Sequence, residues 1–421
     1  MLEPSSPPKA RTNADLPPQW RAFLDMGFRP LYMAGCFWAA LSVALWVFAP
    51  TVLRGSLNGV IWHAHEMLWG FIATIALGFL LTASATWTGV NPLKGRALGW
   101  LCALWLLARL AYLIPGGFFF WFAFVSESLV YLIGAVALGQ VIYKTKSKRN
   151  YGVPPLVLAL GVANGLFLWA VWQGDYPLLM QYFYTGMLCM AVVALLVARR
   201  VIPFFAMRAV PGLTIPMHTG SGQVQLAVGC LAILFSLFAW STGLVPALAA
   251  AGGLALWQVL AWKPLAVRRV PLLWILYIGY AGLSAGLLLA AAQISGKEFN
   301  WLMRDAWPMH TLGVAGFSVL IIGMVTRTAM GHLGLTLKAD RLIMTCYVLL
   351  LISAACRLLA LVPSSVAVST SLLHTSATAW VLTFLVYLWR FFPLLIRPRP
   401  DQPGLVSGSP GRGVPIKISG K

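Results

Sequence analysis

Eight ionisable side chains lie inside long apolar segments of the sequence, where charged residues are otherwise rare. They are His63, His65, Glu66, Arg109, Glu127, His310, Arg357 and His374. Ionisable groups are costly inside a bilayer, so they usually face a cavity or a partner and mark functional sites. Imidazole is a common ligand of haem iron, copper and zinc, and arginine pairs well with carboxylates such as haem propionates. These residue types predict cofactor binding or proton transfer.

Spacing decides which of these groups can act together. His63 and Met67 share a helix face with Glu66 close by, whereas His65 points about 160° away in a regular helix. One metal ion is therefore not expected to bind both histidines. Each histidine has a structural alternative, which is a hydrogen bond to a neighbouring group. Glu66 and Glu127 fit either an ion pair or a proton relay, and the two arginines could instead extend to the lipid headgroups.

The elements that position these groups are membrane spans. Of the 421 residues, 60% are hydrophobic and only 10% are charged, which is more apolar surface than a soluble core can bury. We expect an all-α polytopic membrane protein. Its twelve transmembrane helices are expected at residues 31–50, 60–82, 97–114, 118–143, 154–173, 178–198, 224–241, 243–262, 271–292, 307–329, 342–362 and 364–391.

Lysine and arginine are distributed unevenly between the connections. With the N-terminus inside, 25 of the 30 fall on the inner side and 3 on the outer side. This is the pattern of membrane topology and not of a nucleic-acid-binding face, and it predicts that both termini are cytoplasmic. Residues 1–27 and 397–421 are expected to be flexible cytoplasmic segments on either side of a membrane domain of residues 28–396.

This topology places the eight ionisable groups in the outer half of the membrane. The six cysteines are isolated, with no CxxC pair and no CxxCH haem-attachment motif. A haem would therefore be held without a covalent bond, as a b-type haem.

Two groups of helices contain similar motifs. Trp62-His63-Ala64-His65 aligns with Trp307-Pro308-Met309-His310, and the same offset aligns Gly78 with Gly323. The aligned helices are eight spans apart and so run in the same direction. This indicates a parallel repeat of helices 1–4 and 9–12 about an axis along the membrane normal.

A second set of basic residues lies at the inner ends of helices six and ten. Arg200, Arg327 and His332 belong to it, and we interpret such residues mainly as topology signals and lipid contacts. The sequence contains no Walker A, Rossmann, HExxH or nucleophile-elbow motif, so ATP-driven transport and those enzyme classes have no support.

Several motifs together resemble one family. In chain order they are Phe28-Arg29-Pro30, Trp62-His63-Ala64-His65-Glu66-Met67, Trp87-Thr88-Gly89, Arg200-Val201-Ile202-Pro203-Phe204-Phe205, Pro271-Leu272-Leu273-Trp274, His310, Arg327 and Gly331-His332. The sequence from about Phe28 to Arg397 resembles the NnrS family of bacterial inner-membrane proteins. The resemblance implies twelve helices, haem and copper, and a role in denitrification or in the response to nitric oxide. Thr86 and Tyr277 depart from the family pattern, which puts one metal site in doubt.

Two other classes of membrane protein are alternatives to this interpretation. A catalytic subunit of the oxidase and nitric oxide reductase class needs more histidines, and helices five to eight contain none. A secondary transporter or proton-coupled carrier with an ionisable cavity in the outer leaflet stays open, since carriers also use parallel repeats.

The repeat suggests a specific haem site. His65 and His310 would approach the axis from opposite sides and ligate one iron, while Arg109 and Arg357 would hold its propionates. His63 would then be free for a second metal or a proton path. In the competing arrangement, His63 replaces His65 beside His310. His374 is a further candidate metal ligand.

Overall fold

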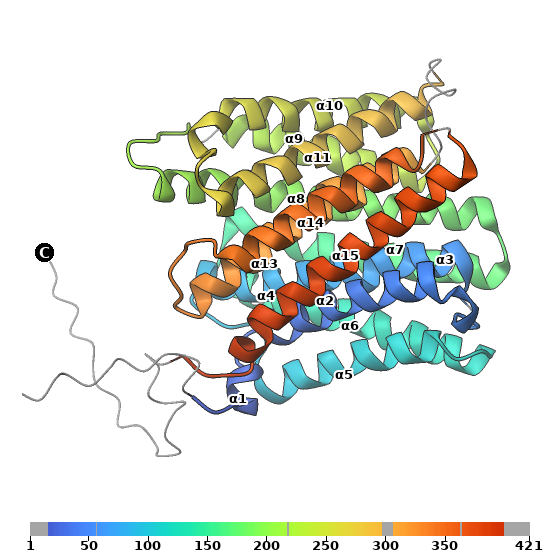
Figure 1. The fold of residues 1–421 in the computed structure, drawn as a ribbon, viewed down its shortest axis with the longest axis horizontal. Coiled ribbons are helices and arrows are strands. Elements are labelled where there is room, and N and C mark those ends of the chain that lie inside the picture. The colour runs from blue at the N-terminus through green and yellow to red at the C-terminus, as the bar shows by residue number, and fades with distance from the viewer. Residues whose placement is uncertain (1–15, 56, 217–218, 297–305, 363, 400–421) are drawn as a thin grey trace, which may run out of the picture.

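The protein is a bundle of long helices (Figure 1). The computed structural model describes residues 16–55, 57–216, 219–296, 306–362 and 364–399. No strand occurs among these residues. The fold is all-α, as predicted.

The long helices follow one another along the chain with short connections. Two of them are made of three consecutive segments: α3 (Gly59–His65), η3 (Glu66–Ile72) and α4 (Ala73–Thr88) form one continuous helix, and α12 (Trp307–His310), η6 (Thr311–Ser318) and α13 (Val319–His332) form another. The other long helices are α2 (Phe28–Phe48), α5 (Gly95–Tyr112), α6 (Gly117–Lys144), α7 (Val153–Gln173), α8 (Tyr176–Ala209), α9 (Thr219–Leu237), α10 (Ser241–Ala261), α11 (Pro271–Ile294), α14 (Arg341–Leu359) and α15 (Val366–Leu395). Short helices are α1 (Trp20–Phe23), η2 (Pro50–Val52), η4 (Lys148–Asn150) and η5 (Pro264–Val267).

Eleven helices in the described part of the chain are long and apolar enough to cross a membrane. The protein is therefore a multi-pass membrane protein. The helix at the place of the third predicted span, α5, is not among the eleven, so the count of twelve and the side of each terminus stay predictions. One boundary was wrong: α8 continues to Ala209, so Arg200 to Phe205 lie within the helix and not after it.

The ends of the chain meet in the bundle. Most consecutive long helices pack against each other, and the last helix, α15, packs along the first long helix, α2 (Figure 1). The helix α3–η3–α4 is the most enclosed, with 83% of its most apolar segment buried. It contacts α12–η6–α13 through the two η segments. The two helices that carry His63, His65 and His310 therefore meet inside the bundle.

Both of these central helices widen into a π-helix at equivalent positions. The first π-helix, η3, begins directly after His65, and the second, η6, begins directly after His310. At the end of each, a hydroxyl donates to the carbonyl five residues earlier, from Thr74 to Trp69 (3.1 Å) and from Ser318 to Gly313 (2.7 Å). The shared distortion agrees with the predicted repeat. π-turns are uncommon and occur often at functional sites.

Part of the predicted N-terminal arm contacts the bundle. The backbone N–H of Gln19 donates to Ile396, and that of Gly95 donates to Leu24. Residues 1–15 of the arm and residues 400–421 of the tail lie outside the described residues.

Candidate functional site

A cavity of about 290 Å³ lies between the two central helices and is lined mostly by apolar side chains. Several of its lining residues belong to α3, which lies at the end of the bundle away from α1 (Figure 1), and the charge distribution predicts that end to be the outer one. The groups in its lining that can bind a metal or an anion include His63, His310, Arg357 and the thioethers of Met67, Met180, Met187 and Met309. The cavity therefore combines an apolar wall with a few nitrogen and sulfur donors, which is typical of ligand and cofactor sites.

His63 and His310 face each other across this cavity. Their ring centroids are 6.5 Å apart and their planes differ by 20°. Nδ1 of His310 lies 2.8 Å from the carbonyl oxygen of Ala306. Because a carbonyl only accepts, this nitrogen is the donor, and the lone pair of the neutral ring is on Nε2. Nδ1 of His63 is buried without a hydrogen-bond partner among the described residues.

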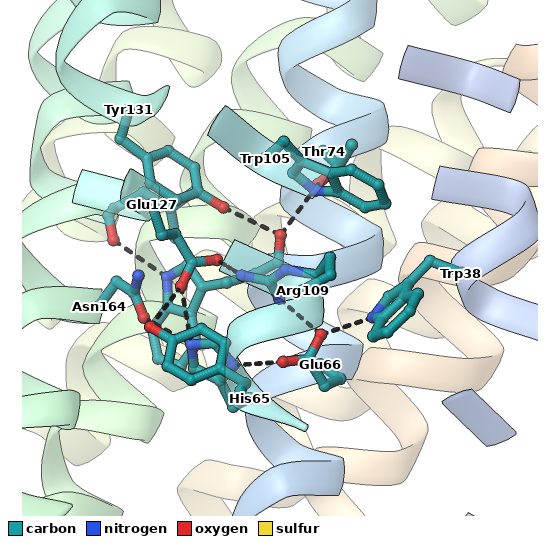
Figure 2. Close-up of polar contacts among 12 residues, drawn as sticks. Trp38, His65, Glu66, Thr74, Trp105, Arg109, Glu127, Tyr131 and Asn164 are labelled. Atoms are coloured by element: carbon teal, nitrogen blue, oxygen red, sulfur yellow. Dashed lines mark hydrogen bonds and ion pairs between the residues drawn. The ribbon is translucent and has the colours of Figure 1, made fainter. Parts of the chain in front are cut away.

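Figure 2 shows a second cluster of ionisable groups, whose members are not among the residues that line the cavity. Arg109 of α5 donates to Glu66 of η3 (2.5 Å) and to Glu127 of α6. His65 lies between the same two carboxylates, with Nδ1 2.9 Å from Glu66 and Nε2 3.1 Å from Glu127. Asn164 of α7 also approaches Nε2, at 3.0 Å. We call His65, Glu66, Arg109, Glu127 and Asn164 the buried ion cluster; each is at most 1% exposed.

The ion cluster fixes its own charge state. Both ring nitrogens of His65 face oxygen acceptors, so the geometry fits the doubly protonated imidazolium, which donates from both nitrogens. Arg109 and the imidazolium then balance the two carboxylates. A neutral, hydrogen-bonded set is the form in which charges can be buried in an apolar interior.

Aromatic side chains complete the cluster. Trp38 of α2 donates to Glu66 (2.5 Å), and Tyr112 donates to Glu127 (3.2 Å). Gly70 of η3 lies against it: an added Cβ would be 2.5 Å from Oε2 of Glu66 and 2.8 Å from Nη1 of Arg109. The five helices α2, α3–η3, α5, α6 and α7 are thus joined by polar bonds at one depth.

These positions correct the favoured haem model in two respects. The histidine beside His310 is His63, because His65 points to the other side of the helix, where Glu66 and Glu127 hold it. Arg109 is likewise paired inside the ion cluster, while Arg357 lines the cavity. The competing arrangement, with His63 beside His310, is the one that the geometry fits.

The remaining predicted residues lie apart from the cavity. His374 is exposed on α15, with its ring 5.6 Å from that of Phe48. The ring of His332 packs on Phe28 at the other end of the bundle. Arg200 donates to Asn150 and to the carbonyls of Arg149 and Leu196, so it holds the connection between α6 and α7. The guanidinium of Arg327 lies 4.1 Å from the centre of the Phe205 ring.

Tyr277, one of the two departures from the family pattern, is buried outside the cavity lining and donates to the carbonyl of Trp262 (3.0 Å). The structure therefore places this departure away from His63 and His310.

Sequence reasoning missed Asn164, Trp38 and Tyr112. Asn164 had a usable signal, since it is a lone amide in the middle of an apolar span. Tryptophan and tyrosine gave none, because both are frequent in membrane helices. Among the described residues, no group of three or more His, Cys, Asp and Glu is arranged to hold a metal ion.

Comparison with known proteins agrees with the motif pattern. No curated protein matches the chain. The family model described as NnrS protein matches residues 22–399, which is nearly the whole chain. The chain therefore belongs to the NnrS family, and this membership supports a role as a membrane protein of the nitric oxide response.

Proposed function

We propose that the protein holds a b-type haem in the cavity between its central helices and acts, in the bacterial inner membrane, in the nitric oxide response that accompanies denitrification. The observation that carries the proposal is the facing pair His63 and His310. The haem would supply a redox-active iron centre. Copper, which the family resemblance also implies, is a second candidate metal.

The spacing of the pair would allow both imidazoles to hold one iron. Two imidazole nitrogens that each lie about 2 Å from one metal can be at most about 4 Å apart, and each ring centre is about 1 Å further out, which gives up to about 6 Å between centres. The observed separation is 6.5 Å. A porphyrin supplies four nitrogens itself, so two histidines suffice, whereas a metal without a porphyrin needs further ligands.

The hydrogen bonding of the pair also fits ligation. Metal-bound histidines usually donate their other ring N–H to a carbonyl or a carboxylate, which fixes the ring. His310 makes such a bond to the carbonyl of Ala306. For copper, the thioethers of Met67 and Met309 in the same lining are suitable soft donors.

The polar groups of the lining have separate tasks in this proposal. Arg357 would pair with a carboxylate at the rim of the haem, as arginine does with propionates. The apolar wall excludes water. The ion cluster does not line the cavity. Arg109 and Glu127 bind Glu66 and His65 of the α3–η3 helix, and these bonds hold that helix in the rotation that presents His63 to the cavity.

The arrangement favours this function over a carrier with an ionisable cavity. A carrier for a charged solute needs its charged groups in the cavity wall. Here Glu66, Arg109 and Glu127 neutralise each other outside the cavity lining, and of the two arginines only Arg357 contributes a charge to the lining.

Visible spectra of the purified full-length protein test the proposal. We expect a Soret band with sharp α and β bands after reduction, and about one iron per chain. His63→Ala and His310→Ala should each abolish or shift these bands, because each removes an axial ligand. His374→Ala is the matched control, since His374 is exposed and outside the cavity lining.

Two results would contradict the proposal. If both alanine variants keep the wild-type spectrum, the pair does not hold the haem. If the folded, full-length protein is colourless and free of iron and copper, the carrier interpretation gains support instead.

A further inference from the structure

The side chain of Arg327 is a buried charge that the proposed function does not use. It lies near the end of α13, at the end of the bundle that is predicted to face the cytoplasm, and only 6% of the residue is exposed. Its Nε is buried without a hydrogen-bond partner. No hydrogen bond or ion pair joins the guanidinium to any residue that the structure describes.

Arg327 packs against an aromatic ring. The guanidinium carbon lies 4.1 Å from the centre of the Phe205 ring of α8. This contact is a favourable cation–π interaction, but an aromatic ring is not an oxygen acceptor. The five N–H donors lie in the plane of the guanidinium group and still need an acceptor.

The carboxylates of the described residues are Asp25, Glu66, Glu127, Asp175 and Asp340, and none of them is joined to Arg327 by a hydrogen bond or an ion pair. Glu66 and Glu127 are held in the ion cluster. Asp340 accepts from Arg390 and from the first turn of α14, and Asp175 accepts from the first turn of α8. The neighbouring aromatic of α8, Phe204, also carries an arginine: the guanidinium of Arg208 lies 4.8 Å from the centre of its ring. The region around Phe204 and Phe205 is therefore positively charged.

We propose that Arg327, stacked on Phe205, binds an oxyanion of the phosphate type at this end of the bundle. A planar guanidinium binds phosphate through two parallel N–H···O bonds, and stacking fixes its orientation without occupying those donors. The terminal nitrogens are not among the fully buried unpaired atoms, so they are the part of the group that a ligand can reach. Basic sites between helices on the cytoplasmic side of membrane proteins bind lipid headgroups. A phospholipid headgroup and free inorganic phosphate offer the same chemistry.

Two measurements on the full-length protein in detergent separate these sources. The first is the amount of phospholipid that stays with each chain after extensive washing, measured by native mass spectrometry. The second is the change in melting temperature on titration with inorganic phosphate at constant ionic strength. Arg327→Gln is the test variant, and Arg208→Gln is the matched control, because Arg208 is an exposed arginine stacked on a ring of the same helix.

The expected result is a loss confined to Arg327→Gln. If the source is lipid, wild type and Arg208→Gln retain a phospholipid that Arg327→Gln loses. If the source is free phosphate, Arg327→Gln weakens the affinity at least tenfold, while Arg208→Gln changes it by less than threefold. Arg327→Lys keeps the positive charge but not the two parallel N–H donors of the guanidinium, so this variant should fold and bind the anion with intermediate affinity. If Arg327→Gln fails to fold, Arg327→Lys replaces it as the test variant. If Arg327→Gln, or Arg327→Lys in its place, equals wild type in both measurements, or if Arg208→Gln loses binding equally, the proposal is wrong.

Discussion

Replacing Arg109 by glutamine tests whether the buried ion cluster is one electrostatic unit. Arg109 is fully buried and bonds to both Glu66 and Glu127. With His65 as an imidazolium, the wild-type cluster is neutral. Arg109→Gln leaves two carboxylates facing one cation in the buried interior. Removing one partner of a buried ion pair costs about 3–5 kcal/mol, and we expect the free energy of unfolding to fall by that amount.

A double-mutant cycle with Glu127→Gln measures the coupling. Each single variant leaves an unbalanced charge, whereas Arg109→Gln with Glu127→Gln restores neutrality. The double variant should therefore be less destabilised than the sum of the two singles, by about 0.5–3 kcal/mol. Unfolding is followed in detergent micelles by titration with a denaturing detergent. His374→Ala, at an exposed position, should stay within about 0.5 kcal/mol of wild type.

Two outcomes would refute the reasoning. If Arg109→Gln lowers the free energy of unfolding by less than about 1 kcal/mol, the buried carboxylates do not need Arg109 to balance their charge. That result would contradict the expected cost of an unpaired buried charge. If the two single effects simply add, the residues do not act as one cluster.

Three further predictions follow from other contacts. Gly70→Ala places a methyl group against the ion cluster and should destabilise by about 1–3 kcal/mol in the same unfolding assay, whereas Gly331→Ala, where an added Cβ meets open space, should not. Partial burial tends to raise the pKa of Asp340, but the hydrogen bonds from Arg390 and from the backbone N–H groups of Ile343 and Leu342, together with the charge of Arg390, outweigh it and lower that pKa below its usual value. Stability should therefore fall as the pH drops below about 4, and this dependence should be weaker in Asp340→Ala, measured by melting temperature against pH. A reporter fused after Lys421 should be active only in its cytoplasm-dependent form; activity of the periplasmic form would reverse the predicted topology.

The positions of the long helices could be predicted because hydropathy is a local property of the chain. The end of α8 could not. Arg199, Arg200 and Pro203 indicate a loop in the sequence, yet the helix continues to Ala209. Proline is tolerated in membrane helices because neighbouring groups satisfy the freed carbonyl. The π-helices η3 and η6 were also beyond sequence reasoning, since their extra residue per turn is accommodated by packing between helices.

The site was predictable in its residue types but not in its partners. Helical periodicity correctly placed His63 and His65 on opposite faces. Which face meets His310 depends on the rotation of the helix, and that rotation is set by contacts with α5, α6 and α7, which no local pattern records. The repeat was also misleading for the arginines, because it treated Arg109 and Arg357 as equivalent.

The difference between the two arginines has a cause in the sequence. At the offset that aligns His65 with His310, Glu66 corresponds to Thr311, and near the equivalent place of Glu127 the second copy has His374. The first copy thus contains both carboxylates, and the second contains neither. Arg109 therefore meets two anions inside the protein, while its counterpart Arg357 lines the cavity.

Because of this asymmetry, the two copies of the repeat position their histidines by different bonds. In the first copy, the carboxylates bind His65 from both sides and fix the rotation of the α3–η3 helix. Because side chains two residues apart on a helix face opposite directions, a helix held at His65 presents His63 to the cavity in one orientation. In the second copy, the bond to Ala306 fixes the ring of His310. Each histidine of the facing pair is thus positioned by its own copy of the repeat, through a different set of bonds, and a metal between them would meet two ligands oriented before it binds.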